Sequence, residues 1–235
     1  MDAEIYRVKE TTSTQDLAIE LIQNQQRSPQ EMWAVIADTQ TLGKGRKGRV
    51  WLDNSKSMLT SINIPRVQLQ KHIPQISVVV AVQKTLQKIQ SDKIKIKWPN
   101  DFLNSQNQKI GGILIYEQPQ SFICGIGINC AEIEKIQKSR FIKQEVGSIQ
   151  ADPIELLDNI LAHLKVIPKE TSAESLAYYN SKMAYLDQKV EFKKVGSNLF
   201  VPGKLIGTNK EGLLLLETLD GMIELSSIDE IRLIN

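Results

Sequence analysis

The C-terminal part of the chain constrains the fold most strongly, because from Gln188 onward it consists of short strand-like segments and turns without a helical pattern. The bends in this part fall at glycines, at positions 196, 203, 207, 212 and 221. Short strands so closely spaced are typical of a small β-barrel or meander. We therefore predict a boundary near Leu186, with one domain at residues 1–186 and a small β-barrel domain at residues 187–235.

The part before this boundary mixes strand and helix periodicities. Apolar runs predict strands at residues 1–10, 32–37, 57–64, 94–98, 110–117 and 122–129. Helical spacing predicts helices at about residues 14–25, 73–89, 153–164 and 172–185. A chain of 235 residues, of which 41% are hydrophobic, is long enough to bury a substantial core.

Composition excludes several classes of protein. A formal net charge of +2 argues against a global nucleic-acid or membrane-attracting field, although it says nothing about local patches. Cys124 and Cys130 are too few for a disulfide framework and are typical of buried thiols in a reducing compartment. The N-terminus has no signal-peptide pattern, and no apolar run approaches the roughly 20 residues that span a bilayer. We therefore expect a cytoplasmic protein that does not enter a membrane.

A basic glycine-rich loop, Thr41–Trp51 with the sequence TLGKGRKGRVW, stands out from this neutral background. Its glycines allow backbone N–H groups to approach an anion closely, and its arginines add planar donors for carboxylate or phosphate oxygens. The cations are Lys44, Arg46, Lys47 and Arg49. The sequence of the loop alone is compatible with three interpretations: a small-anion site, a solvated flexible loop, or contact with a nucleic-acid backbone.

Three further motifs favour the small-anion site. KWPND at residues 97–101 ends a predicted strand in a rigid polar turn, and KIGGILIYE at residues 109–117 begins with a lysine before two glycines. GIGIN at residues 125–129 places glycines inside a predicted strand, where they favour the close approach of a ligand. Lys109 could neutralise a carboxylate or a phosphate in such a site.

Taken in order, STQ, GKGRKGRVW, KWPND, KIGGIL and GIGIN closely resemble the catalytic domain of biotin protein ligases, also called biotin–[acetyl-CoA-carboxylase] ligases. The C-terminal strands resemble the SH3-like domain that ends these enzymes. The resemblance covers essentially the whole chain. It implies an α+β fold, with a mixed sheet and flanking helices as in class II aminoacyl-tRNA synthetases, followed by a small SH3-like β-barrel.

The resemblance also implies an activity. Biotin's carboxylate would attack the α-phosphate of ATP, with Mg²⁺, to give biotinyl-5′-AMP and pyrophosphate. A lysine of a biotin carboxyl carrier protein, such as that of acetyl-CoA carboxylase, would then displace AMP. Converging cations suit this chemistry, because two anions must be brought together and the transition state gains charge. The resemblance leaves a homodimer open.

Site residues follow from the matching motifs. Lys109 and Arg46 would be catalytic, bridging biotin's carboxylate and the α-phosphate. The biotin contacts implied are Ser13, Thr14, Gln15, Gln40, Gly43, Lys44, Gly45, Arg46, Lys109, Gly112, Gly125 and Gly127. The ATP contacts implied are Arg46, Arg49, Trp51, Asn100, Asp101, Lys109 and Asn129, with Asp101 also a candidate ligand of ATP-bound Mg²⁺.

The chain departs from the family pattern at three places. Lys44 replaces an arginine and so loses the planar guanidinium, Gln15 replaces an asparagine, and Leu42 replaces a small residue. We expect the basic loop to be mobile without ligand, because its cations repel one another. The signature begins at Ser13 without room for a DNA-binding domain before it, so we expect no specific DNA binding. The alternatives are a lipoate or octanoyl ligase or transferase of the same fold, and a nucleic-acid-binding module.

Overall fold

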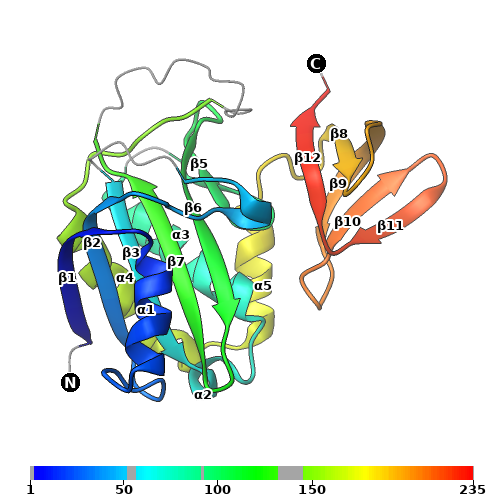
Figure 1. The fold of residues 1–235 in the computed structure, drawn as a ribbon. Helices are drawn as coiled ribbons and strands as arrows, with labels where there is room; N and C mark the ends of the chain where they lie inside the picture. Colours follow the sequence, from blue (N-terminus) through cyan, green and yellow to red (C-terminus); the bar gives the residue numbers. More distant parts are fainter. Residues whose placement is uncertain (1–2, 52–56, 91–92, 132–144, 235) are drawn as a thin grey trace.

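The computed structural model describes residues 3–51, 57–90, 93–131 and 145–234, which form two β-sheets and flanking helices (Figure 1). The first sheet has seven strands in the order β1-β2-β3-β7-β6-β5-β4; β1 and β2 are parallel, and all other pairs are antiparallel. Its strands are β1 (Glu4–Thr11), β2 (Trp33–Gln40), β3 (Ser57–Pro65), β4 (Lys95–Lys97), β5 (Asp101–Leu103), β6 (Lys109–Glu117) and β7 (Ser121–Asn129). The predicted α+β fold with a mixed sheet is confirmed.

Helices cover both faces of this sheet. The helices are α1 (Thr14–Gln23), α2 (Arg66–Leu69), α3 (Pro74–Ile89), α4 (Pro153–Val166) and α5 (Ser172–Ser181), with short 3₁₀ turns η1 (Arg46–Gly48) and η2 (Ile167–Lys169). In Figure 1, α1 lies in front of the sheet while α3 and α4 lie behind it. None of the helices in the described ranges is long and apolar enough to cross a membrane.

Alternation along β2 explains the two layers. Trp33 and Val35 pack in a small cluster with α1, whereas Ala34 and Ile36 belong to the main core on the α3 and α4 side. Each fully buried side chain of this size contributes roughly 1.5–3 kcal/mol relative to exposure. The sheet is therefore fixed from both sides.

The second sheet contains β8 (Lys189–Lys194), β9 (Val201–Thr208), β10 (Leu214–Thr218), β11 (Gly221–Leu225) and β12 (Ile228–Leu233). Its strands are antiparallel in the order β11-β10-β9-β8-β12, so the predicted closed barrel is not formed by the described pairings. β11 and β12 lie at opposite edges, although only Ser226 and Ser227 separate them in sequence. Such a short link reaches about 10 Å, so the sheet must curl until its edges approach without exchanging ladder hydrogen bonds.

Most predicted elements appear within a few residues of their expected bounds. The strand β5 was not predicted, because three residues after a polar turn carry too little alternation to detect. The last helix before the second sheet ends at Ser181, earlier than the expected 185. The second sheet begins at Lys189, just after the predicted boundary near Leu186, and the division into two domains stays a prediction.

Candidate active site at the basic loop

Polar side chains meet at the N-terminus of α1. Ser13 caps the helix, and its Oγ accepts a hydrogen bond from the Gln15 backbone N–H at 3.2 Å. Gln40, at the end of β2, accepts at Oε1 from the Thr14 backbone N–H at 2.7 Å and from the Thr14 hydroxyl at 3.0 Å. The Thr14 hydroxyl also lies 2.9 Å from that of Ser61 on β3. The structure thus brings together the polar residues predicted to contact the biotin head group.

Gln15 also fixes the neighbouring strands. Its Nε2 donates to the Leu114 carbonyl on β6 at 3.1 Å and to the Ile123 carbonyl on β7 at 3.2 Å. A methyl group added at Gly125 would lie 3.7 Å from the Gln15 amide, an ordinary contact. Gly125 therefore faces the polar cluster across the surface of β7.

The basic loop between β2 and β3 is folded on itself. The Gly45 N–H donates to the Arg49 carbonyl at 2.8 Å, and the Trp51 N–H donates to the Gly43 carbonyl at 2.9 Å. A methyl group at Gly43 would lie 2.8 Å from the Trp51 carbonyl, and one at Gly45 would lie 3.2 Å from the Arg49 carbonyl. The loop's own backbone therefore requires glycine at position 43, whereas a side chain at position 45 would need the Arg49 carbonyl to move slightly.

Three consecutive cations of the loop bind three different parts of the molecule. The contacts are Lys44 Nζ to Asp16 Oδ1 at 2.6 Å, Arg46 Nη1 to Asn100 Oδ1 at 3.1 Å and Lys47 Nζ to Asp229 Oδ1 at 2.7 Å. Lys47 also donates to the Ile228 carbonyl at 3.0 Å. Two of these partners are carboxylates and one is a neutral amide, and the mobility of the loop without ligand stays a prediction. Arg49 is exposed.

A second group of charges lies on the strands below the loop. Lys109 Nζ is 2.7 Å from Asp101 Oδ1 and 5.6 Å from the centre of the Trp51 ring. Burial lowers the pKa of Arg46 and of Lys97, and the charge of Asp101 opposes this shift at both. The carboxylate of Asp101 therefore stabilises the cations that surround it.

Two glycines of this region make room for protein side chains. A methyl group at Gly127 would lie 2.6 Å from ring atoms of Trp51, and one at Gly112 would lie 2.8 Å from Asp101 Oδ1 and 3.5 Å from Lys109 Nζ. Both positions had been predicted to leave space for biotin. In the structure, they admit the indole ring and the charged pair that would themselves contact the ligand.

The two predicted asparagines are both engaged. Asn129 Nδ2 donates to the Gly147 carbonyl at 2.8 Å, and its Oδ1 accepts from the Ser57 hydroxyl at 3.4 Å. Asn100 Nδ2 donates to the Ile113 carbonyl while its Oδ1 accepts from Arg46. Each amide is thus oriented by the protein before any ligand arrives, and the predicted adenine contact of Asn129 stays a prediction.

Sequence reasoning missed four residues that hold this site. Asp16 pairs with Lys44, Ser61 contacts Thr14, and the Tyr179 hydroxyl donates to the Pro99 carbonyl at 3.0 Å. Asp229 binds the loop from the second sheet. Strand alternation could have indicated Ser61, but the other three lie on elements whose relative placement no local pattern gives.

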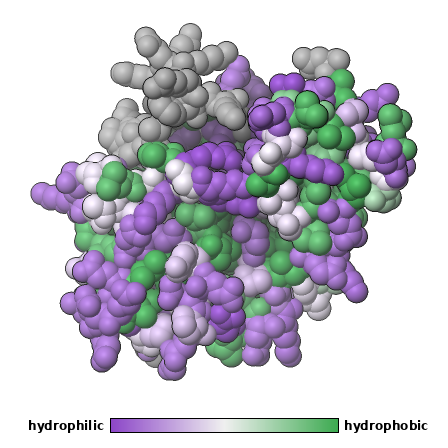
Figure 2. Space-filling model, turned by 45° about the vertical axis from the view of Figure 1, so that its right-hand side comes forward, coloured by the Kyte–Doolittle hydropathy of each residue, from purple (hydrophilic) through white to green (hydrophobic). Residues whose placement is uncertain are grey.

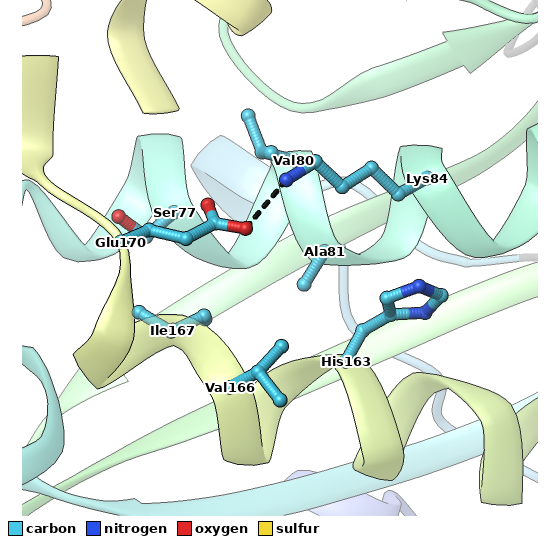
Figure 3. Close-up of a pocket in the computed structure, with 8 residues that line it drawn as sticks. All are labelled: Ser77, Val80, Ala81, Lys84, His163, Val166, Ile167 and Glu170. Atoms are coloured by element: carbon cyan, nitrogen blue, oxygen red, sulfur yellow. Dashed lines mark hydrogen bonds and ion pairs between the residues drawn. The ribbon is translucent and has the colours of Figure 1, made fainter. Parts of the chain in front are cut away.

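The face in Figure 2 is hollowed near its centre, where hydrophobic residues lie below a band of hydrophilic ones. A separate groove of about 350 Å³ lies beside the start of α4 and includes Ser57, the hydrogen-bond partner of Asn129. Its lining is Arg7, Ile36, Ala37, Asp38, Ser57, Pro153 and Ile154. A separate void of about 10 Å³ between α3 and α4 (Figure 3) is no larger than a water molecule needs.

No group of three His, Cys, Asp or Glu side chains that could hold a metal occurs in the described ranges. Asp101 contributes a single carboxylate, and that carboxylate is paired with Lys109. A metal with phosphate ligands of its own could use one carboxylate in this way. The site as a whole offers clustered cations beside a group of neutral polar side chains at the start of α1, which suits an uncharged polar head group joined to an anion.

The sequence model of the biotin/lipoate A/B protein ligase family matches residues 5–131. The bifunctional ligase/repressor BirA of Bacillus subtilis (strain 168) is 30% identical over 239 residues, covering 93% of this chain and 70% of the relative. A biotin–protein ligase of Homo sapiens is 39% identical over 99 residues, covering 38% of this chain and 14% of the relative.

A solved structure gives the same result for the fold. The biotin protein ligase from Aquifex aeolicus in complex with biotin and ATP superimposes with a TM-score of 0.77 at 27% identity. The match covers 98% of this chain and 99% of that one. It therefore includes the second sheet as well as the first.

Proposed function

The chain belongs to the biotin/lipoate A/B protein ligase family, and from this premise we propose that it is an ATP-dependent biotin protein ligase. It activates biotin to biotinyl-5′-AMP and transfers biotin to a lysine of a biotin carboxyl carrier protein. The human relative is named a biotin–protein ligase, and the similar solved structure is a biotin protein ligase that holds biotin and ATP. They give the lipoate or octanoyl alternative less support.

One observation carries the proposal: the surface of β7 connects the polar side chains at the start of α1 with the cations of the basic loop and Lys109. Gly125 faces Gln15, and two residues along the same face Gly127 lies under Trp51. A ligand lying along this face would place an uncharged head group at the polar side chains of Thr14 and Gln15 and its carboxylate next to the basic loop. This order of groups matches the polarity of biotin, an uncharged head group joined to a carboxylate.

The residues divide the chemistry between them. Ser13, Thr14, Gln15 and Gln40 hold and orient the head group. Arg46 and Lys109 neutralise the carboxylate and the α-phosphate, which lets two anions approach and stabilises the charge that develops during attack. The carboxylate oxygen then bonds to the α-phosphorus as the bond to pyrophosphate breaks. Arg49, which is exposed, would meet the leaving pyrophosphate.

We propose that Mg²⁺ enters with the phosphates of ATP rather than in a site made by the protein. Asp101 is the carboxylate that would hold it, with ATP oxygens supplying other ligands. When bound, the metal would neutralise phosphate charge. The nucleic-acid alternative loses its main support, because Lys44, Arg46 and Lys47 bind partners within the protein. The cytoplasmic location, the absence of specific DNA binding and a homodimer stay predictions.

The test is biotin-dependent release of pyrophosphate from MgATP, followed by labelling of a biotin carboxyl carrier domain. Lys109→Ala should lower the rate by more than about a hundredfold, since it removes a positioned charge at the reacting groups. Lys210→Ala removes a lysine whose side chain is 88% exposed and should leave the rate unchanged. No biotin-dependent pyrophosphate release by the unaltered protein would refute the proposal.

A further inference from the structure

We propose that Asn100 is a positioning residue that aims the Arg46 guanidinium at the reacting anions, and that it does not itself contact ATP. The inference rests on the proposed function and refines it, because Asn100 was predicted from sequence to line the ATP site. It assigns the asparagine of the KWPND turn to the protein's own arginine.

The geometry of the Asn100 amide leaves little choice of partner. Asn100 is 7% exposed, and its Nδ2 donates to the Ile113 carbonyl on β6. That bond fixes the orientation of the amide, so Oδ1 is the end directed at Arg46. An Oδ1 atom carries only acceptor lone pairs and would repel a phosphate oxygen. Oδ1 can bind only a hydrogen-bond donor or a cation, and the donor that it meets in the structure is Arg46 Nη1, 3.1 Å away.

The backbone of the turn is equally well held. The Asn100 N–H donates to the Lys97 carbonyl at 3.2 Å, and the Asn100 carbonyl accepts from the Ile113 N–H at 3.0 Å. The buried Tyr179 hydroxyl of α5 binds the Pro99 carbonyl. Asn100 therefore belongs to a turn that hydrogen bonds hold in place, whereas Arg46 belongs to a surface loop.

Because of this difference in rigidity, the contact with Asn100 can hold the Arg46 side chain in one conformation. Arginine has many rotamers, and holding one of them in advance removes an entropy cost from the reaction step. A neutral amide suits the task better than a carboxylate. An aspartate at position 100 would add a second negative charge beside Asp101, holding Arg46 away from its substrate and repelling the anions.

The experiment is a double-mutant cycle on biotinyl-5′-AMP formation under single-turnover conditions. Asn100→Ala should slow adenylate formation about 10- to 100-fold in the otherwise unaltered protein. In an Arg46→Ala background, the same substitution should cost less than about twofold, because its target is already gone. Full multiplication of the two effects would overturn the inference, since it would mean that Asn100 meets the substrates independently.

A second variant and a control separate positioning from folding. Asn100→Asp keeps the shape of the side chain and should slow adenylate formation. The Mg²⁺ concentration that gives half of the maximal rate should stay unchanged. A fall in that concentration would mark Asn100 as a metal ligand and overturn the inference. Asn63→Ala is the matched control, because Asn63 is a buried amide at the far end of β3 whose Nδ2 donates to the backbone carbonyls of Pro29 and Glu31, before β2. It should lower the Tm without slowing adenylate formation in the folded protein.

A readout without substrates distinguishes failure of this inference from failure of the proposed function. Arg46 should react faster with phenylglyoxal in Asn100→Ala than in the unaltered protein, with exposed Arg49 as an internal reference measured by mass spectrometry. Equal reactivity of Arg46 in both proteins would overturn the inference even if the ligase is active. Failure of the unaltered protein to release pyrophosphate would refute the proposed function instead.

Discussion

Gly125 and Gly127 lie on one face of β7, yet a methyl group would meet different neighbours at each. At Gly125 it would lie at least 3.5 Å from every neighbour, an ordinary van der Waals distance. At Gly127 it would lie 2.6 Å from the ring of Trp51, closer than real side-chain atoms approach. The position of the Trp51 ring therefore depends on the absence of a side chain at Gly127.

Gly127→Ala should displace the indole of Trp51 toward solvent and shift its fluorescence to longer wavelength. Because the ring can swing away, the loss of stability should stay below about 1 kcal/mol, while the KM for ATP should rise about tenfold if the ring packs on the nucleotide. Gly125→Ala should leave the spectrum unchanged. Identical spectra for the two variants would contradict this account of Gly127.

At this scale, the sequence predicted which residues gather but not what each one touches. Residue type and its place before two glycines were enough to select Lys109, whereas the polar residues around Thr14 were selected only through the resemblance to the family. The Asp101 partner of Lys109 lay within a selected motif, although the ion pair between them was not foreseen. The partner of Lys44 was missed, because an ion pair between a loop and a helix leaves no periodic trace.

Helices α3 and α4 meet through a hydrogen-bonded histidine. The Thr85 hydroxyl donates to the Ala81 carbonyl at 3.0 Å and lies 2.7 Å from His163 Nδ1, so Nδ1 carries the proton. Nε2 is then the acceptor of the Lys88 ammonium at 3.2 Å. Burial lowers the pKa of His163, and the charge of Lys88 lowers it further. The neutral ring is the form that fits this contact.

The sign of the pH effect follows directly. The unfolded chain binds a proton at His163 near pH 6.5, whereas the folded protein resists it, so stability falls as the pH drops below about 6.5. His163→Gln should flatten the fall in Tm between pH 7.5 and pH 5.5 by a few degrees at most, because the ring is partly exposed. His72→Gln is the control, because it removes the protein's other histidine. An unchanged slope in His163→Gln would contradict the assignment.

The sequence predicted long elements well and short ones poorly. The buried helix α3 carries apolar residues through four turns, and its pattern located it within one residue. β5 has three residues and is defined by pairing with its neighbours, which a single sequence does not display. The open edges of the second sheet depend in the same way on long-range pairing.

Across the whole molecule, the basic loop connects parts that the sequence had separated into two domains. Lys47 reaches Asp229 and the Ile228 carbonyl on β12 of the second sheet, and Trp98 Nε1 in the first part donates to the Gly212 carbonyl at 3.1 Å. Hydrogen bonding to Lys47 is the main cause that lowers the pKa of Asp229. The second sheet thus contributes to the shape of the site through this loop.

The strength of this link can be measured by proteolysis without ligand. Asp229→Asn removes the charge that holds Lys47, so trypsin should cut after Lys47 severalfold faster, since local opening governs cleavage. Glu191→Gln breaks the Arg232–Glu191 pair between β8 and β12, which does not touch the loop, and should leave that cleavage rate unchanged. Biotin with MgATP should slow cleavage in both variants if the loop closes on its ligands. Equal rates in Asp229→Asn and the unaltered protein would show that the loop holds its fold without the second sheet.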